Sequence, residues 1–422
     1  MKKYKTFILF WLSQSISQLG SAMTGFALIL WTYEQSRSAM SVSLMSFCNY
    51  VPYILVSLFA GAFVDRHKKK SIMLVSDSIA AVCTFTVLVL TVSGKLAVWN
   101  IYAVNVVIGF MNAFQQPAAA VAIGKMVPKE NLSNVSGMNS FSSNLVSFLN
   151  PVIAAFIYSF GGLKIILLID IVSFLFALFV LMFAVHISEE YKNSEKSFVF
   201  SDLMVGFKFL KKEKGLLYIM FTLAMINFFS RLTYENILSP MILSRSGSSV
   251  TLGIVNAVMG IGGIIGGIVV SAGKGSKNNV KMIYISAAVS FVLGDLMMAV
   301  GRNSVMWSLA AFAASSPIAF IMAGQNVIMY EKVPEKMQGR IFAARNAIQF
   351  STIPLGILLG GFLADYVFEP FMKSDNVITH VFSFIVGSGD GIGMAVMFLC
   401  TGISGFIISI LSYRNKEIQK FK

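Results

Sequence analysis

Seven ionisable side chains interrupt long apolar stretches of this 422-residue sequence. A charge in water-poor surroundings is costly, so such a group is either neutralised by a partner or kept because it binds a proton, an ion or a ligand. The seven are Asp77, Asp170, Arg231, Glu235, Asp295, Arg345 and Asp365. They are the first candidates for chemistry in a chain of which only 12% is charged.

Arg231 and Glu235 stand four residues apart, which places them on one face of a helix. They can neutralise each other. Alternatively, Arg231 holds Glu235 poised as a proton or cation site, because low-dielectric surroundings favour proton uptake by carboxylates. Asp77 is a third candidate for proton coupling, although we expect it to pair with loop lysines or Arg66. For Asp170 and Asp295 we expect a role in helix packing.

Neutral polar residues recur at helical spacing within the same apolar stretches, so they form polar faces. In lipid, such faces point toward another helix, where they form hydrogen bonds, or toward a watery cavity. Aromatic and methionine side chains accompany them, and a cavity with this lining would fit a bulky amphipathic ligand. The candidate cavity residues are Gln14, Gln18, Ser21, Asn112, Gln116 and Asn227.

Several other chemistries find no support in the residues. The sequence contains no phosphate-binding loop of the form G-x-x-x-x-G-K-[ST], so ATP hydrolysis by that route is excluded. Its three histidines are scattered, and its three cysteines show no metal-binding spacing. We therefore expect a protein that is not an enzyme and that holds no metal and no cofactor.

The elements that carry these residues are apolar segments of membrane-spanning length. Hydrophobic residues make up 56% of the chain, and its charge is about half the ~25% of a soluble domain. Disorder, a coiled coil and an ordinary soluble enzyme are excluded. A helical span needs roughly 20 apolar residues. Twelve stretches qualify: 7–33, 40–63, 71–93, 98–123, 134–159, 164–187, 216–241, 250–271, 281–300, 305–328, 341–366 and 389–412.

A polar segment and an internal repeat divide the chain in two. Residues 188–215 are polar and charged and separate the spans six and six. Gly61 and Gly267 close the second and eighth spans, and Pro128 and Pro334 follow the fourth and tenth, both pairs 206 residues apart. The sequence therefore predicts an all-α membrane protein of two pseudo-symmetric six-helix bundles, 1–187 and 216–422, joined by a cytoplasmic loop over 188–215.

Lysine and arginine placement predicts the orientation. If the N-terminus is inside, 26 of these residues fall in inner loops and ends and six in outer loops. Basic residues accumulate on the cytoplasmic side of membrane proteins. Both termini are therefore expected in the cytoplasm, in a multi-pass protein of the cell membrane. The net charge of +14 is spread over short loops, which argues against a nucleic-acid partner.

The residues after the second span carry a family resemblance. Gly61-Ala62-Phe63-Val64-Asp65-Arg66, followed by lysines, resembles the G-x-x-x-D-R loop of the major facilitator superfamily. The run Gly109–Pro117 and the segment Val127–Leu132 look like its macrolide-efflux and siderophore-exporter branch. The resemblance implies that Gly61, Asp65 and Arg66 form a gate. Arg345 follows the loop that contains Arg340, and we expect both arginines to belong to the inner gate. An ordinary solvated turn at Asp65-Arg66 is the alternative.

The pattern departs from proton-coupled drug exporters in two places. The span 98–123 lacks the arginine that many of them carry, and Asn150-Pro151 is followed by Val152, Ala154 and Ala155 where those exporters have glycines.

The resemblance implies a monomeric secondary transporter in the lipid bilayer that exports a lipophilic small molecule, such as a macrolide, in exchange for protons. A siderophore or metabolite exporter, an uptake carrier of the same fold, and a transporter-like receptor that moves nothing remain open.

Overall fold

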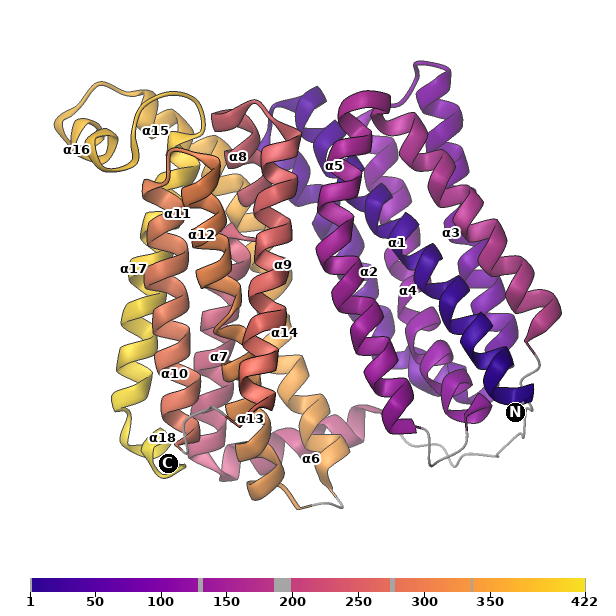
Figure 1. Ribbon diagram of the computed structural model, residues 1–422. Coiled ribbons are helices and arrows are strands. Elements are labelled where there is room, and N and C mark those ends of the chain that lie inside the picture. The colour runs from indigo at the N-terminus through magenta and orange to yellow at the C-terminus, as the bar shows by residue number, and fades with distance from the viewer. Residues whose placement is uncertain (1, 128–131, 186–198, 274–277, 335–336, 422) are drawn as a thin grey trace. The chain divides into compact units, whose positions relative to one another are not determined.

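The computed structural model describes residues 2–127, 132–185, 199–273, 278–334 and 337–421 (Figure 1). Regular structure within these ranges is helical, and no strand occurs in them. Internal contacts divide the chain into two units, which we describe separately. Unit 1 comprises Met1–Arg37 and Leu44–Lys196, and unit 2 comprises Ser38–Ser43 and Ser197–Lys422.

Unit 1 is built from five long helices and a short π-helical end. They are α1 (Lys2–Ser36), α2 (Ala39–Arg66), α3 (Lys69–Val92), α4 (Val98–Met126), α5 (Leu132–Phe179) and η2 (Val180–Ala184). The first residues of α2, up to Ser43, belong to unit 2. The predicted spans 134–159 and 164–187 share α5, which is interrupted at Gly162, where φ is +60°. Glycine adopts this backbone conformation without steric cost, so it is the residue expected at such a break.

The helices of unit 1 pack α1 against α5 and α3 against both α4 and α5. Its core includes the buried residues Phe7, Met73, Ala118 and Leu181. The C-terminal end of η2 is closed by Lys70, whose Nζ donates to the carbonyl oxygens of Met182 and Val185, both at 2.8 Å. A lysine is well suited to this place because the last carbonyls of a helix lack partners and carry partial negative charge.

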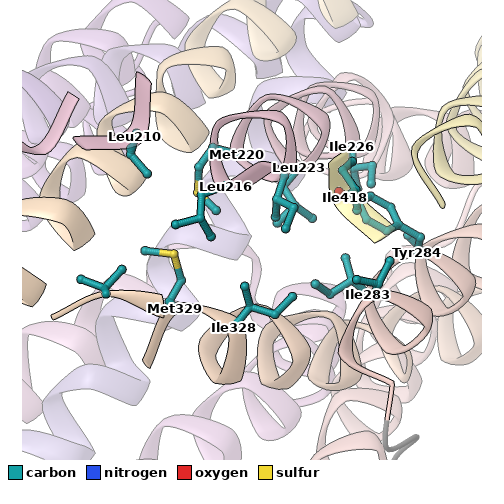
Figure 2. Close-up of a cluster of buried hydrophobic side chains, with 14 of the residues drawn as sticks. Leu210, Leu216, Met220, Leu223, Ile226, Ile283, Tyr284, Ile328, Met329 and Ile418 are labelled. Atoms are coloured by element: carbon teal, nitrogen blue, oxygen red, sulfur yellow. The ribbon is translucent and has the colours of Figure 1, made fainter. Parts of the chain in front are cut away.

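Unit 2 contains more and shorter elements. They are α6 (Val199–Lys212), α7 (Lys214–Thr233), α8 (Leu238–Ser246), α9 (Ser249–Ser271), α10 (Asn279–Val289), η3 (Ser290–Leu296), α11 (Met297–Val300), α12 (Ser304–Ser315), α13 (Ile318–Lys332), α14 (Gln338–Leu363), η5 (Ala364–Phe368), α15 (Glu369–Lys373), α16 (Val377–Val386), α17 (Ile392–Arg414) and α18 (Lys416–Gln419). Figure 2 shows its core, where Met220 and Leu223 of α7 lie near Ile283 of α10 and Ile328 of α13. Leu210 of α6 is fully buried in the same cluster.

Ten helical segments of the described chain are long and apolar enough to cross a membrane. One of them, Phe141–Ala184, has 44 residues, about twice the length that one crossing needs, and contains the break at Gly162. The predicted span 7–33 falls on α1, which is 35 residues long. The all-helical membrane architecture is confirmed, and the number twelve stays a prediction.

The glycines of α9 show how closely two helices of unit 2 approach. A Cβ on Gly266 would lie 2.1 Å from the carbonyl oxygen of Ser316, and one on Gly262 would lie 2.2 Å from the hydroxyl of Ser315. Gly263 and Gly267 have no neighbour within 4 Å of such an atom. The glycine face formed by Gly262 and Gly266 therefore permits the close packing of α9 on α12.

Candidate functional site

The polar faces predicted for the first and fourth spans lie on α1 and α4 of unit 1. Gln18, near the middle of α1, is exposed, and so are Asn112 and Gln116, near the middle of α4. The Tyr53 hydroxyl of α2 donates to Gln116 Oε1 at 2.8 Å. An exposed amide at mid-helix is costly against hydrocarbon, so these side chains mark a polar surface.

Asp77 of α3 lies beside this surface and is held by amides rather than by cations. Its Oδ1 accepts a hydrogen bond from Gln115 Nε2 of α4 at 3.0 Å. Gln14 of α1 approaches the same carboxylate, and its Nε2 is buried with no partner of hydrogen-bond geometry. The expected pairing with lysines or Arg66 is therefore wrong for the described residues. The reason is that Asp77 faces α1 and α4 within the unit instead of the basic loop.

Asp170 of α5 joins three helices of unit 1 through hydroxyl groups. Ser21 and Thr24 of α1 donate to its two carboxylate oxygens at 2.9 Å each, and Thr84 of α3 donates at 3.2 Å. The Asp170 side chain is buried. Ser21, a candidate cavity residue, thus contributes a helix-packing contact, and Asp170 has the packing geometry expected from the sequence.

Asp295 of unit 2 has an equivalent packing geometry, as expected from the sequence. Asp295 lies buried in η3 and accepts a hydrogen bond from Thr401 of α17 at 2.7 Å. The buried Tyr234 hydroxyl lies beside it, outside hydrogen-bond geometry. Each unit therefore ties its helices with one buried carboxylate and a threonine on a neighbouring helix. Sequence could identify the lone acids, but not which of many threonines faces them.

Arg231 and Glu235 form an ion pair, as their spacing predicted. They do not lie on a continuous helix, because α7 ends at Thr233 and a turn over residues 234–237 precedes α8. Pro240 explains the break, since it has no N–H for the carbonyl of Asn236 and its ring crowds that carbonyl. The predicted span 216–241 therefore contains an irregular turn, although Tyr234 and Ile237 keep right-handed helical dihedrals and Lys214–Ser246 remains one apolar segment of spanning length.

The α7–α14 junction holds this break in place. A Cβ on Gly360 would lie 2.3 Å from the carbonyl oxygen of Leu232, so the two backbones are in close contact. Thr352 Oγ1 donates to the carbonyl of Ala224 at 3.1 Å, and Asn236 Nδ2 donates to that of Ile357 at 3.3 Å. Asn227, a predicted cavity residue on α7, is partly exposed.

Asp365 has a role that the sequence did not indicate. Its carboxylate accepts hydrogen bonds from the Ser38 hydroxyl at 2.6 Å and from the backbone N–H groups of Ala39 and Met40 at 3.1 and 2.9 Å. Ser38 in turn accepts from the N–H of Ser41 at 3.1 Å. An anion and a serine thus satisfy the first turn of α2, where N–H groups are unpaired and the helix dipole is positive.

Three of the five predicted gate residues, Gly61, Arg66 and Arg345, can be placed in the structure. Gly61 is exposed, and a Cβ there would have no neighbour within 4 Å. Arg66 is the exposed last residue of α2. The side chains of Asp65 and Arg340 lie outside the described part of the structure. Arg345 donates to Asn346 Oδ1 and Asn326 Oδ1 at 3.0 to 3.2 Å and lies over the Phe342 ring. Among the described residues, no group of three or more His, Cys, Asp or Glu could hold a metal ion.

Comparison with known proteins agrees with this architecture. The chain is 25% identical over 380 residues to macrolide efflux protein A of Streptococcus pyogenes, which covers 87% of this chain and 92% of the relative. It is 26% identical over 399 residues to the staphyloferrin A transporter of Staphylococcus aureus, covering 91% and 96%. The crystal structure of a nucleoside transporter, NupG, superimposes with a TM-score of 0.72 at 13% identity, covering 98% and 99%.

The family model described as "Major Facilitator Superfamily" matches residues 10–357, which is most of the chain. The members of this family are transporters rather than enzymes, and the helical architecture of the two units is that of a multi-pass membrane protein. The chain belongs to the major facilitator superfamily.

Proposed function

We propose that the protein exports a bulky, amphipathic small molecule of the macrolide type by alternating access. The observation that carries this proposal is the set of exposed amides midway along apolar helices, Gln18 on α1 with Asn112 and Gln116 on α4. Amides in that position bind a ligand with scattered polar groups, while Phe110 and Phe114, whose ring centroids are 5.4 Å apart, offer it apolar contact. The similarity to macrolide efflux protein A over 87% of the chain supports the same class of substrate.

Proton antiport is the energy source in this proposal. Glu235 is the first candidate carrier, because it is an ionisable group within the seventh span, and Arg231 would hold it in place and stabilise it when it has released its proton. Asp77 is the second, since its neighbours Gln115 and Gln14 are uncharged. A carboxylate without a cationic partner can exchange a proton without breaking an ion pair.

In the cell membrane both termini would be cytoplasmic, with the protein acting as a monomer and the gate formed by Gly61, Asp65, Arg66, Arg340 and Arg345 at the inner face. The loop 188–215 would join the two halves in the cytoplasm. Lysine and arginine placement along the chain supports this orientation.

A siderophore or related metabolite is the second candidate substrate. The observation that favours it is the 26% identity to the staphyloferrin A transporter, which extends over 91% of this chain. In this alternative the molecule is exported or taken up on the same fold.

The proposal is tested by measuring accumulation of a radiolabelled macrolide in cells with and without the protein. We expect lower accumulation in expressing cells, and a protonophore should abolish the difference. Glu235→Gln keeps the shape and a hydrogen-bond acceptor for Arg231 but cannot ionise, so export should stop. Asp375→Asn is the matched control, because this carboxylate is 91% exposed in the connection before α16 and should be dispensable.

Equal macrolide accumulation with and without the protein would refute drug export. A parallel assay with staphyloferrin A tests the second candidate substrate. If a siderophore is the substrate, its export or uptake should depend on the protein. Export that survives Glu235→Gln and also responds to the protonophore would assign proton coupling to another residue, with Asp77→Asn as the next variant.

A further inference from the structure

Unit 2 contains a polar pocket that is separate from all the residues discussed above. Its volume is about 540 Å³, and Arg245, Arg302, Trp307, Ser383, Phe384 and Asp390 are among its lining residues. Arg245 comes from the last turn of α8, Arg302 from the short link between α11 and α12, and Phe384 from the last turns of α16. Two guanidinium groups and one exposed carboxylate give this lining a positive balance.

The two arginines retain unused hydrogen-bond donors. Arg245 Nη2 donates to the carbonyl of Val386 at 2.7 Å, and its Nη1 is buried without a partner. Arg302 Nη2 donates to the carbonyl of Phe384 at 3.3 Å. A guanidinium offers five donors in a planar fork that matches phosphate and carboxylate oxygens. Among the described residues, no carboxylate lies within ion-pair distance of either arginine. Glu369 is near enough to attract Arg245 electrostatically, and a bound anion would further relieve the repulsion between the two arginines.

The pocket lies where membrane spans end. Arg245 is one residue from the end of the span Lys214–Ser246, and Arg302 lies between the spans Asn279–Val300 and Ser304–Lys332. Trp307, 5.8 Å below the Arg245 guanidinium, stands in the first turn of the latter. Arginine and tryptophan at the ends of spans are typical of the headgroup region of a bilayer. The pocket is therefore expected at the depth of the lipid phosphates in the bilayer.

The helix α16 borders this pocket and exposes an apolar stripe. Phe384, which lines the pocket, is 86% exposed, and Val377 is 79% exposed. Ile378, Val381 and Ile385 continue the stripe at helical spacing. With ten residues α16 is far too short to span a bilayer. Figure 1 shows it with α15 at the end of unit 2 opposite α18.

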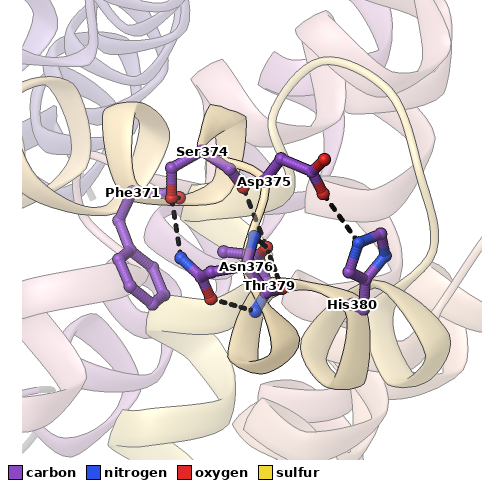
Figure 3. A network of polar contacts seen from close by, with 6 residues as sticks. All are labelled: Phe371, Ser374, Asp375, Asn376, Thr379 and His380. Carbon is purple, nitrogen blue, oxygen red and sulfur yellow. Dashed lines mark hydrogen bonds and ion pairs between the residues drawn. The ribbon is translucent and has the colours of Figure 1, made fainter.

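A polar network fixes the start of α16. Figure 3 shows Asn376 accepting from the N–H of Thr379 at 2.9 Å, while the Thr379 hydroxyl accepts from the N–H of Asn376 at 3.1 Å. His380 Nε2 and Asp375 Oδ1 lie 2.7 Å apart in an exposed hydrogen bond at the same helix end. A short helix that is capped in this way, with one apolar stripe beside polar groups, suits the membrane interface.

We propose that this pocket binds the phosphate of a membrane phospholipid, whose acyl chains lie along the apolar stripe of α16. Arg245 and Arg302 hold the phosphate oxygens, and Phe384 lies at the junction between headgroup and chains. By the orientation proposed above, the lipid belongs to the outer leaflet. The site would anchor α15 and α16 to the bilayer, and it requires no assumption about the transported substrate.

The test uses the full-length protein, purified in detergent and stripped of lipid. Dimyristoyl phosphatidylglycerol is titrated and binding is measured by native mass spectrometry, in parallel with dimyristoylglycerol, which lacks the phosphate, and with inorganic phosphate alone. We expect tight binding of the phospholipid only. Arg302→Gln should weaken it about tenfold to a hundredfold, as the loss of a charge-assisted hydrogen bond predicts. Phe384→Ser should weaken it as well.

Lys95→Gln serves as the control, because it removes an exposed positive charge of another predicted outer loop. Equal loss of binding in Lys95→Gln and Arg302→Gln would overturn the proposal in favour of general charge attraction. Equal binding of dimyristoylglycerol would remove the phosphate from the interaction. Tight binding of inorganic phosphate with no effect of Phe384→Ser would make this a site for a free anion. If Arg302→Gln does not fold, the proposal is tested with Arg302→Lys and Phe384→Ser instead. Both variants should bind the phospholipid more weakly than the wild type, and wild-type binding by both would overturn the proposal.

Discussion

Replacing Gly266 by alanine should loosen the packing of α9 on α12. The new Cβ would lie 2.1 Å from the carbonyl oxygen of Ser316, whereas an ordinary contact begins at 3.4 Å. The two helices would have to separate by about 1.3 Å at this point. A gap of that size forfeits at least about half of the dispersion energy of the neighbouring contacts. Overpacking of this kind costs about 1–3 kcal/mol of unfolding free energy.

Gly267→Ala is the matched control for Gly266→Ala. The residue is next in the same helix, and a Cβ there has no neighbour within 4 Å. Both substitutions gain the same helix propensity, up to about 1 kcal/mol in water, so this gain cancels in the comparison. We therefore expect Gly266→Ala to be about 1–3 kcal/mol less stable than Gly267→Ala.

The measurement is unfolding of the purified variants in detergent, by heat or by added denaturing detergent. Gly262→Ala and Gly263→Ala form a second such pair, with a Cβ contact of 2.2 Å to the Ser315 hydroxyl in the first and none in the second. The Ser315 hydroxyl can rotate away, which leaves the carbonyl oxygen of Phe312 at 2.8 Å from the new Cβ, so the difference should be smaller than for Gly266 and Gly267. Equal stability of Gly266→Ala and Gly267→Ala would refute the close approach of the two helices.

Three further predictions concern two polar contacts and one glycine. Thr401→Val removes the hydroxyl that donates to Asp295 at 2.7 Å and should cost about 0.6–1.7 kcal/mol of stability. Thr86→Val, at an exposed position of α3, should cost less than about 0.5 kcal/mol, and equal unfolding midpoints of the two variants would contradict this prediction. Asp365→Ala should destabilise the first turn of α2 by about 0.5–2 kcal/mol, seen as faster hydrogen exchange at residues 39–43, and unchanged exchange there would show that this carboxylate is not the cap. Gly61→Ala should leave stability within about 0.5 kcal/mol of wild type, because its Cβ meets nothing within 4 Å, so a transport defect in a stable variant would assign Gly61 to the conformational cycle.

The buried carboxylates suggest how each unit keeps its helices together. Asp170 collects hydroxyls from α1 and α3, and Asp295 pairs with Thr401 of α17. Interhelical hydrogen bonds in membranes contribute about 0.6 kcal/mol each on average, so these contacts align helices more than they stabilise them. Alternating access by rigid bodies needs units that keep their internal alignment.

The sequence anticipated the helical membrane architecture and the local pairing of Arg231 with Glu235. It did not anticipate the break after Thr233, although Pro240 is visible, because a proline in an apolar run can kink, break or leave a membrane helix continuous. It placed Asp365 among costly charges without a role. Its partners are Ser38 and the N–H groups that follow, more than 320 residues earlier in the chain, and no local pattern encodes such a contact.

Composition and periodicity alone determined that this chain folds as apolar helices, because hydrocarbon tolerates only segments whose backbone bonds are satisfied internally. They also singled out the few side chains whose burial needs an explanation. Tertiary structure decided what satisfies each of them: amides for Asp77, hydroxyls for Asp170 and a helix N-terminus for Asp365. It also brought Arg245 and Arg302 to one pocket. These partners are chosen by packing between distant segments, which depends on the whole set of contacting surfaces rather than on neighbours in the sequence.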